Sequence, residues 1–342
     1  MIKESFPLVG VVGSPYSRKL RASLRYRHVP YVWIHQGSPE AASLPKPKVD
    51  LLPQLIMRDP DGQRVARIDT TPLIRELELL VQNGRSVIPD DPAIAFLDAL
   101  IEDYADEWLT KAMFHYRWAY EADIAKAGTI LPRWSGSQQT DEFLAKVGQI
   151  FSTRQIDRLS VVGSNAMTGP IIEESYVRFL ELFEDHLRSH RFVLGDRPAS
   201  CDFGLYGQLT QLALFDPTSM ETTLRVAPRV YAWTGLVEDL SGLEPQPDQW
   251  IERNSIPDTL RALLGEIGRV YPPFLLANAA ALAQGSDLVE CEIGGQAWTQ
   301  KPFPYQAKCL GWLRRDYAAL DKTDRDFIDE VIQGTGLDLL FG

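Results

Sequence analysis

Ser14 stands directly before Pro15 at the end of a short apolar run, and Ser followed by Pro is a typical helix start. A hydroxyl at this position lies among unpaired N–H groups and at the positive end of the helix dipole. It could donate a hydrogen bond to a thiolate and so favour ionisation of a cysteine thiol, whose free pKa is about 8.5. Ser14 could equally serve only as a helix cap. Tyr16 and Ser17 are neighbouring candidates for the same thiolate contact.

A second set of titratable residues comprises Glu102, Asp103, Asp106 and Glu107, followed by His115, on one expected helix. Carboxylates at four-residue spacing together with a histidine can suggest a metal site, but the HExxH arrangement is absent. We therefore expect no metal. The acidic residues are interpreted as the charged outer face of a helix whose inner face is aromatic.

A small α/β domain is expected to position Ser14. Apolar and β-branched runs predict strands over 7–12, 31–35, 54–57 and 63–68. Helical patterns predict helices from Ser14-Pro15 to about His28 and from Asp69 to about Gln82. A proline-rich loop is expected over 36–50, between the second and third strands. The order predicts a parallel βαβ unit followed by an antiparallel hairpin, which gives a four-stranded mixed sheet.

Helices dominate the rest of the chain. We expect one helix over 93–126, a Gly/Ser/Trp-rich loop over 128–139 and another helix over 171–189. From Glu244 an extension follows, with a hairpin about Gly294-Gly295 and two helices. Because these two helices carry apolar stripes that require a packing partner, we expect the extension to dock on the helical domain. The expected domains are 1–88, 89–243 and 244–342.

Composition and charge exclude several classes of protein. The 342 residues include 35 basic and 46 acidic side chains, and the net charge of −11 disfavours general binding to nucleic acid or anionic membrane. The longest apolar run, 274–283, spans about half of a membrane helix. Three scattered cysteines and no visible signal peptide indicate a cytoplasmic protein without disulfides. The first helix is locally basic, with Arg18, Lys19, Arg21, Arg25 and Arg27. These residues could steer an anion, although such a run is more often a solvated helix face or an interface.

Four motifs occur in an order that resembles a cytosolic glutathione transferase of a serine type. They are Ser-Pro-x-Ser-x-Lys-x-Arg from Ser14, Leu-Pro-x-Leu-Ile from Leu52, Asp-Thr-Thr-Pro-Leu-Ile-x-x-Leu from Asp69, and 192–198 followed by Asp202. The resemblance covers roughly residues 5–240. It implies a thioredoxin-like N-terminal domain followed by an all-α domain, while the class within the family stays open.

The resemblance also implies a glutathione site. Ser14 matches the catalytic position of the first helix. Leu52 and Pro53 match a residue and cis-proline whose backbone pairs with the cysteinyl part of glutathione. Asp69 and Thr70 match an acidic residue and a hydroxyl that hold the γ-glutamyl amine and carboxylate, although both also cap helices well.

Further contacts are expected around this site. Lys48 is the candidate cation for the glycyl carboxylate of glutathione. The expected electrophile pocket comprises Tyr16, Trp108, His115 and Trp118, and the eight tryptophans of the chain fit an apolar pocket.

The activity implied is attack of glutathione thiolate on a soft, largely apolar small-molecule electrophile, by a homodimer. Glutathione enters as co-substrate. The alternatives are a glutathione-dependent isomerase or dehalogenase on the same fold, and a catalytically degenerate interaction module whose extension binds a partner.

Overall fold

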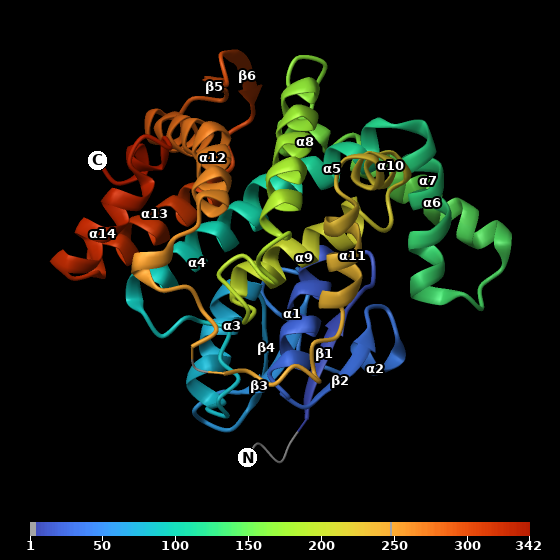
Figure 1. The fold of residues 1–342 in the computed structure, drawn as a ribbon. Coiled ribbons are helices and arrows are strands. Elements are labelled where there is room, and N and C mark those ends of the chain that lie inside the picture. Colours follow the sequence, from blue (N-terminus) through green and yellow to red (C-terminus); the bar gives the residue numbers. More distant parts are fainter. Residues whose placement is uncertain (1–4, 247) are drawn as a thin grey trace.

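The N-terminal domain is an α/β unit built on a four-stranded sheet (Figure 1). The structure is a computed structural model that describes residues 5–246 and 248–342. The sheet is four-stranded and mixed, as predicted, with β1 and β2 parallel and β3 and β4 forming an antiparallel hairpin. Its order is β2-β1-β3-β4, because β1 also pairs antiparallel with β3. One short helix, α2, interrupts the loop expected over 36–50, because Ser38 caps it and Pro39 begins it. The elements are β1 (Phe6–Gly10), α1 (Pro15–Tyr26), β2 (Tyr31–His35), α2 (Pro39–Ala42), β3 (Gln54–Arg58), β4 (Arg64–Arg67) and α3 (Thr70–Leu80).

The following segment is helical, but two predictions within it are wrong. Residues 93–126 form no single helix, because a π-helical turn separates α4 from α5 and Tyr120 adopts an extended backbone before α6. Residues 128–136, expected as a loop, belong to α6, where Leu131 and Trp134 pack into a small apolar cluster. The elements are α4 (Pro92–Tyr104), η1 (Ala105–Leu109), α5 (Thr110–Ala119), α6 (Glu121–Gly136), α7 (Asp141–Ile156), η2 (Leu159–Val161), α8 (Gly169–His186), α9 (Ser200–Leu212), α10 (Pro217–Val226) and α11 (Pro228–Val237).

The C-terminal segment packs on the helical domain. Helix α12 contacts α8 and α4, and α13 and α14 contact α4, so that one hydrophobic core runs through all three parts of the chain. The predicted hairpin is present, with Gly294 and Gly295 both at positive φ as a two-residue turn requires. No sequence pattern pointed to α12, which contains Pro272 and Pro273. The elements are η3 (Arg253–Ser255), α12 (Asp258–Gln284), β5 (Val289–Ile293), β6 (Gln296–Gln300), α13 (Pro304–Ala319), α14 (Lys322–Ile332) and η4 (Leu337–Leu340). In the described ranges, no helix has the length and apolar character needed to cross a bilayer.

Helix α9 sets the position of α1. All of its residues are buried, and it packs against α1, α4 and η1. A Cβ atom on Gly207 would lie 2.7 Å from the carbonyl oxygen of Pro15, so only glycine permits this approach. The start of α1, where Ser14 lies, is thereby fixed against the second domain.

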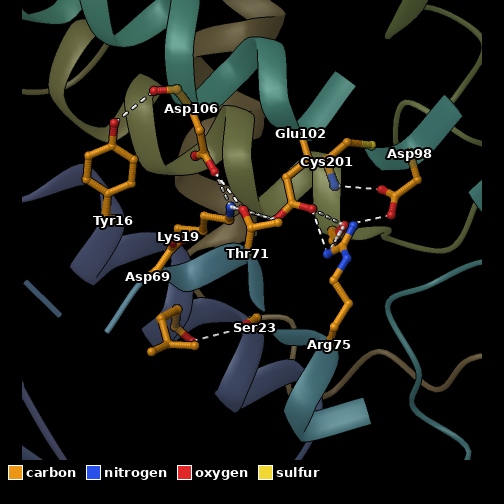
Figure 2. A network of polar contacts seen from close by, with 12 residues as sticks. Tyr16, Lys19, Ser23, Asp69, Thr71, Arg75, Asp98, Glu102, Asp106 and Cys201 are labelled. Atoms are coloured by element: carbon orange, nitrogen blue, oxygen red, sulfur yellow. Dashed lines mark hydrogen bonds and ion pairs between the residues drawn. The ribbon is translucent and has the colours of Figure 1, made fainter. Parts of the chain in front are cut away.

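A buried ion network joins α1 and α3 to α4 and η1 (Figure 2). The Lys19 ammonium lies 2.6 Å from Glu102 Oε1 and 2.5 Å from Asp106 Oδ2, and donates to Thr71 Oγ1 at 3.2 Å. Arg75 contacts the other oxygen of Glu102 at 2.7 Å. The acidic residues of α4 and η1 therefore face the domain interface, which corrects the prediction that they form a solvated outer face.

The carboxyl groups of this interface have shifted pKa values. Burial would raise the pKa of Glu102, but Arg75 and Lys19 hold it below its ordinary value. Burial raises the pKa of Asp103 to about 7, and burial with the neighbouring charges of Asp103 and Asp106 raises the pKa of Glu107 to about 8. Burial would lower the pKa of Lys19, but Asp106 and Glu102 keep it above its ordinary value.

The basic face of α1 is an interface. Arg18, Arg21 and Arg25 all form ion pairs with Glu238, the residue that follows α11. Of the three interpretations of this face, the structure supports the interface, because Arg18, Arg21 and Arg25 are paired with an acidic residue of the helical region.

Replacing Lys19 with methionine should destabilise the protein strongly. The variant leaves Glu102 and Asp106 buried without their cation, and breaking a buried ion pair costs about 3–5 kcal/mol. Chemical denaturation measures the loss, and Lys146→Met, at an exposed position of α7, is the matched control with an expected change within about 0.5 kcal/mol. Equal stability of the two variants would show that the network does not hold the interface.

The raised pKa of Glu107 should make stability fall with increasing pH. An unfolded glutamate titrates near 4.3, whereas folded Glu107 keeps its proton until about pH 8. Its stabilising contribution is therefore complete below about pH 4 and is lost as the pH rises to about 8, at up to ~1.4 kcal/mol per pH unit. In urea unfolding at pH 5, 7 and 9, Glu107→Gln should show a shallower decline than the wild type. Glu142→Gln, at an exposed position, should keep the wild-type decline, and a decline in Glu107→Gln equal to that of the wild type would contradict the assignment.

Candidate functional site

The strand register brings three predicted site segments to one edge of the sheet. Val9 pairs with Gln54, so the segment that follows β1 lies beside the segment that precedes β3. Leu55 pairs with Arg67, so the segment that precedes β3 also lies beside the one that follows β4. Ser14, Leu52-Pro53 and Asp69-Thr70 belong to these three segments.

Ser14 caps α1. It has an extended backbone, and its Oγ accepts a hydrogen bond from the Ser17 N–H at 3.2 Å. Ser17 is itself buried, with its Oγ 3.5 Å from the Val11 N–H. The Tyr16 hydroxyl donates to the Asp106 carbonyl at 2.8 Å, and burial, together with Glu107 and Asp106, raises the Tyr16 pKa well above its ordinary value. Ser14 is therefore the best placed of the three hydroxyls to meet a ligand.

Two side chains of α6 cover the loop before Ser14. A Cβ atom on Gly13 would lie 2.5 Å from Leu131 Cδ2 and 3.3 Å from the Trp134 ring. Neither residue was predicted to belong to the site, because residues 128–139 were expected to form a loop. They give the surroundings of Ser14 an apolar wall.

Leu52 and Pro53 are joined by a cis peptide bond, which confirms that part of the prediction. Pro53 is buried and Leu52 is partly exposed at the start of β3. Lys48 lies in the preceding loop with an exposed side chain, whereas the neighbouring Lys46 donates to the Ala41 carbonyl at 3.0 Å.

Asp69 precedes α3 with an unusual backbone, at φ 75°, and its side chain makes no capping hydrogen bond to the helix. The carboxylate instead accepts a hydrogen bond from the Tyr305 hydroxyl of α13 at 2.7 Å. The first N–H groups of α3, at Thr70 and Thr71, are thus not capped by Asp69, and such groups suit an anion. No local signal in the sequence pointed to Tyr305.

Three of the four residues expected to line the electrophile pocket have roles in the core. Trp108 donates from Nε1 to Ser175 Oγ at 3.1 Å and packs on aromatic rings of the C-terminal segment. His115 lies between Ser164 and Glu173, with contacts of 2.8 and 2.9 Å. Trp118 packs in the small cluster beside α6 and α7. These contacts replace the pocket-lining roles predicted for Trp108, His115 and Trp118.

A cleft of about 410 Å³ opens between α3, α4 and α13. Thr71, in the first turn of α3, lines this cleft together with Asp103 and Cys309. Asp103 accepts a hydrogen bond from Tyr271 of α12 at 2.7 Å. In the described part of the chain, no group of three His, Cys, Asp or Glu side chains is arranged to hold a metal ion.

Several solved structures are similar to this chain. A glutathione transferase family member from Pseudomonas fluorescens, with two glutathione molecules bound, is 14% identical, with a TM-score of 0.39 over 76% of this chain and 92% of that chain. One from Burkholderia graminis, also with two glutathione molecules per subunit, is 17% identical, with a TM-score of 0.39 over 76% and 88%. A Tau class glutathione S-transferase from mango, Mangifera indica, is 19% identical, with a TM-score of 0.41 over 72% and 96%. No curated protein matches the sequence.

One family model matches the N-terminal part of the chain. Residues 8–83 match the model described as glutathione S-transferase, N-terminal domain. The match covers the sheet, the cis-proline segment and α3, which together form the edge described above. The N-terminal part of the chain, residues 8–83, is therefore similar to the N-terminal domain of glutathione S-transferases.

Proposed function

We propose that the protein binds glutathione at this sheet edge and conjugates its thiolate to a soft, largely apolar electrophile. The observation that carries the proposal is the start of α3. Asp69 turns its carboxylate away from the helix, which leaves an anion site and an acidic group side by side. The γ-glutamyl group of glutathione carries a carboxylate and an ammonium group on one carbon and matches this pair.

The rest of the tripeptide extends along the edge. The backbone of Leu52 pairs with the cysteinyl residue in the manner of an added strand. The exposed Lys48 is the cation nearest in sequence to this segment for the glycyl carboxylate, since Lys46 is hydrogen-bonded to Ala41. This placement directs the glutathione thiol toward Ser14.

The chemistry requires a thiolate at the start of α1. The thiol loses its proton to solvent, and the positive end of the helix dipole and the Ser14 hydroxyl stabilise the anion. The sulfur lone pair then forms a bond to the electrophilic atom, and any leaving group departs with its bonding electron pair. Leu131 and Trp134 offer an apolar surface for the electrophile in place of Trp108 and Trp118. The homodimer implied by the resemblance belongs to the same proposal, as does the cytoplasmic location indicated by the three scattered cysteines.

Ser14→Ala should slow turnover while leaving glutathione affinity nearly unchanged. The variant removes one hydrogen bond to a charged acceptor, worth roughly 1.5–3 kcal/mol, or about 10- to 150-fold in rate. The ultraviolet absorbance of bound thiolate should titrate at higher pH in the variant. Ser38→Ala is the matched control, because Ser38 also precedes a proline and caps its helix through an Oγ contact of 3.2 Å.

Two results would contradict the proposal in different ways. If Ser14→Ala costs about 1 kcal/mol of stability and leaves turnover per folded molecule intact, Ser14 is only a cap. If glutathione at millimolar concentration fails to raise the melting temperature of the wild type, this edge is not a glutathione site, since ligand at 100 times its Kd should add about 2.7 kcal/mol.

A further inference from the structure

We infer that Tyr305 of the C-terminal segment is a positioning residue for Asp69, and that this segment thereby completes the part of the site that holds the γ-glutamyl ammonium group. The inference rests on the proposed function and goes beyond it. The resemblance to glutathione transferases extends only to about residue 240, and Tyr305 lies outside it.

The Tyr305 hydroxyl is held in a fixed place. Two residues before it, Phe303 exchanges hydrogen bonds with the Asn278 side chain of α12, at 2.8 and 3.0 Å. One residue after it, the buried Gln306 donates to the Glu107 carbonyl of η1 at 3.1 Å. The first turn of α13 is therefore fastened to both α12 and η1, and Tyr305 lies between the two attachments.

Asp69 needs an external partner for its orientation. Its side chain makes no capping bond to α3, and its φ of 75° lies in a region that few non-glycine residues adopt. The contact with Tyr305, at 2.7 Å, determines where the carboxylate points. Because a carboxylate can accept about four hydrogen bonds, this contact orients Asp69 without exhausting its capacity for an ammonium group.

Cys309 and Tyr305 of α13 lie near several carboxyl groups. Burial raises the pKa of the Cys309 thiol of α13. The pKa is raised further by four neighbouring acidic residues, Asp103, Glu107, Asp69 and Asp106. Burial and Asp69 likewise raise the pKa of Tyr305, so its hydroxyl remains a donor at neutral pH. Thr71, one residue beyond the expected carboxylate contact, lines the cleft that also contains Asp103, Cys309 and the two arginines Arg75 and Arg315.

A purely structural role for Tyr305 predicts a different behaviour. If the Tyr305–Asp69 bond only fastened α13 to the N-terminal domain, its loss would lower stability and leave ligand preference unchanged. If Tyr305 obstructed the site, its loss would tighten glutathione binding. Affinities for glutathione and for an analogue in which hydrogen replaces the γ-glutamyl amine separate these possibilities.

The test is Tyr305→Phe, with Tyr317→Phe as the matched control. Tyr317 lies on the same helix and donates to Asp329 at 2.6 Å on the exposed side. Calorimetric titration should show the Kd for glutathione rising roughly 2- to 10-fold in Tyr305→Phe, the range expected for one net hydrogen bond. The Kd for the analogue should be the same in Tyr305→Phe and wild type, kcat at saturating glutathione should be unchanged, and Tyr317→Phe should match the wild type throughout.

Each other outcome overturns the inference. An unchanged or lower Kd for glutathione in Tyr305→Phe excludes a positioning role, and an equal rise for glutathione and the analogue shows that the amine is not what Tyr305 serves. In an Asp69→Asn background, a Tyr305→Phe effect as large as in the wild type would show that Tyr305 does not act through Asp69. If the wild type binds neither ligand, the proposed function itself fails, which is a result distinct from the other three.

Discussion

Lys19 is a fully buried cation, and the site depends on the network that neutralises it. Two carboxylates of the second domain, Glu102 and Asp106, contact its ammonium group, while Thr71 brings in the start of α3. Burial of an ion is costly unless partners and hydrogen bonds compensate it, so this network has few tolerable arrangements. It therefore specifies how α1 and α3, which carry the candidate ligand contacts, sit against α4 and η1 (Figure 2).

The same constraint explains why the C-terminal segment belongs to the site. Asp103 and Glu107 are next to the acidic partners of Lys19 in the sequence, and burial raises the pKa of both carboxyl groups. Helices α12 and α13 cover them with hydrogen-bonding groups, Tyr271 on Asp103 and Gln306 on the Glu107 backbone. Tyr305 of α13 donates a hydrogen bond to Asp69. The contacts that stabilise the interface therefore also determine the geometry of the candidate ligand site.

Local patterns predicted the sheet, the cap at Ser14 and the late hairpin, because strand periodicity, a Ser-Pro start and a Gly-Gly turn are short-range signals. Contacts between distant segments were not predictable in this way. Tyr305 and Asp69 are 236 residues apart, and nothing near either residue indicates the other. The burial of Glu102 was not predicted, because charged residues are mostly exposed. Only the position of its partner Lys19 in the fold shows that Glu102 is buried in an ion pair. Trp108 was assigned to a pocket because an aromatic residue on a helix suits either a pocket or a core.

Hydrogen–deuterium exchange with and without glutathione tests most directly whether the N-terminal domain and the C-terminal segment form one site. The account predicts slower amide exchange at the start of β3, at the start of α3 and also over the first turn of α13, residues 304–308, because ligand held by Asp69 stabilises its contact with Tyr305. Protection of the first two segments with unchanged exchange over 304–308 would contradict the account, since the ligand site would then be complete without the C-terminal segment.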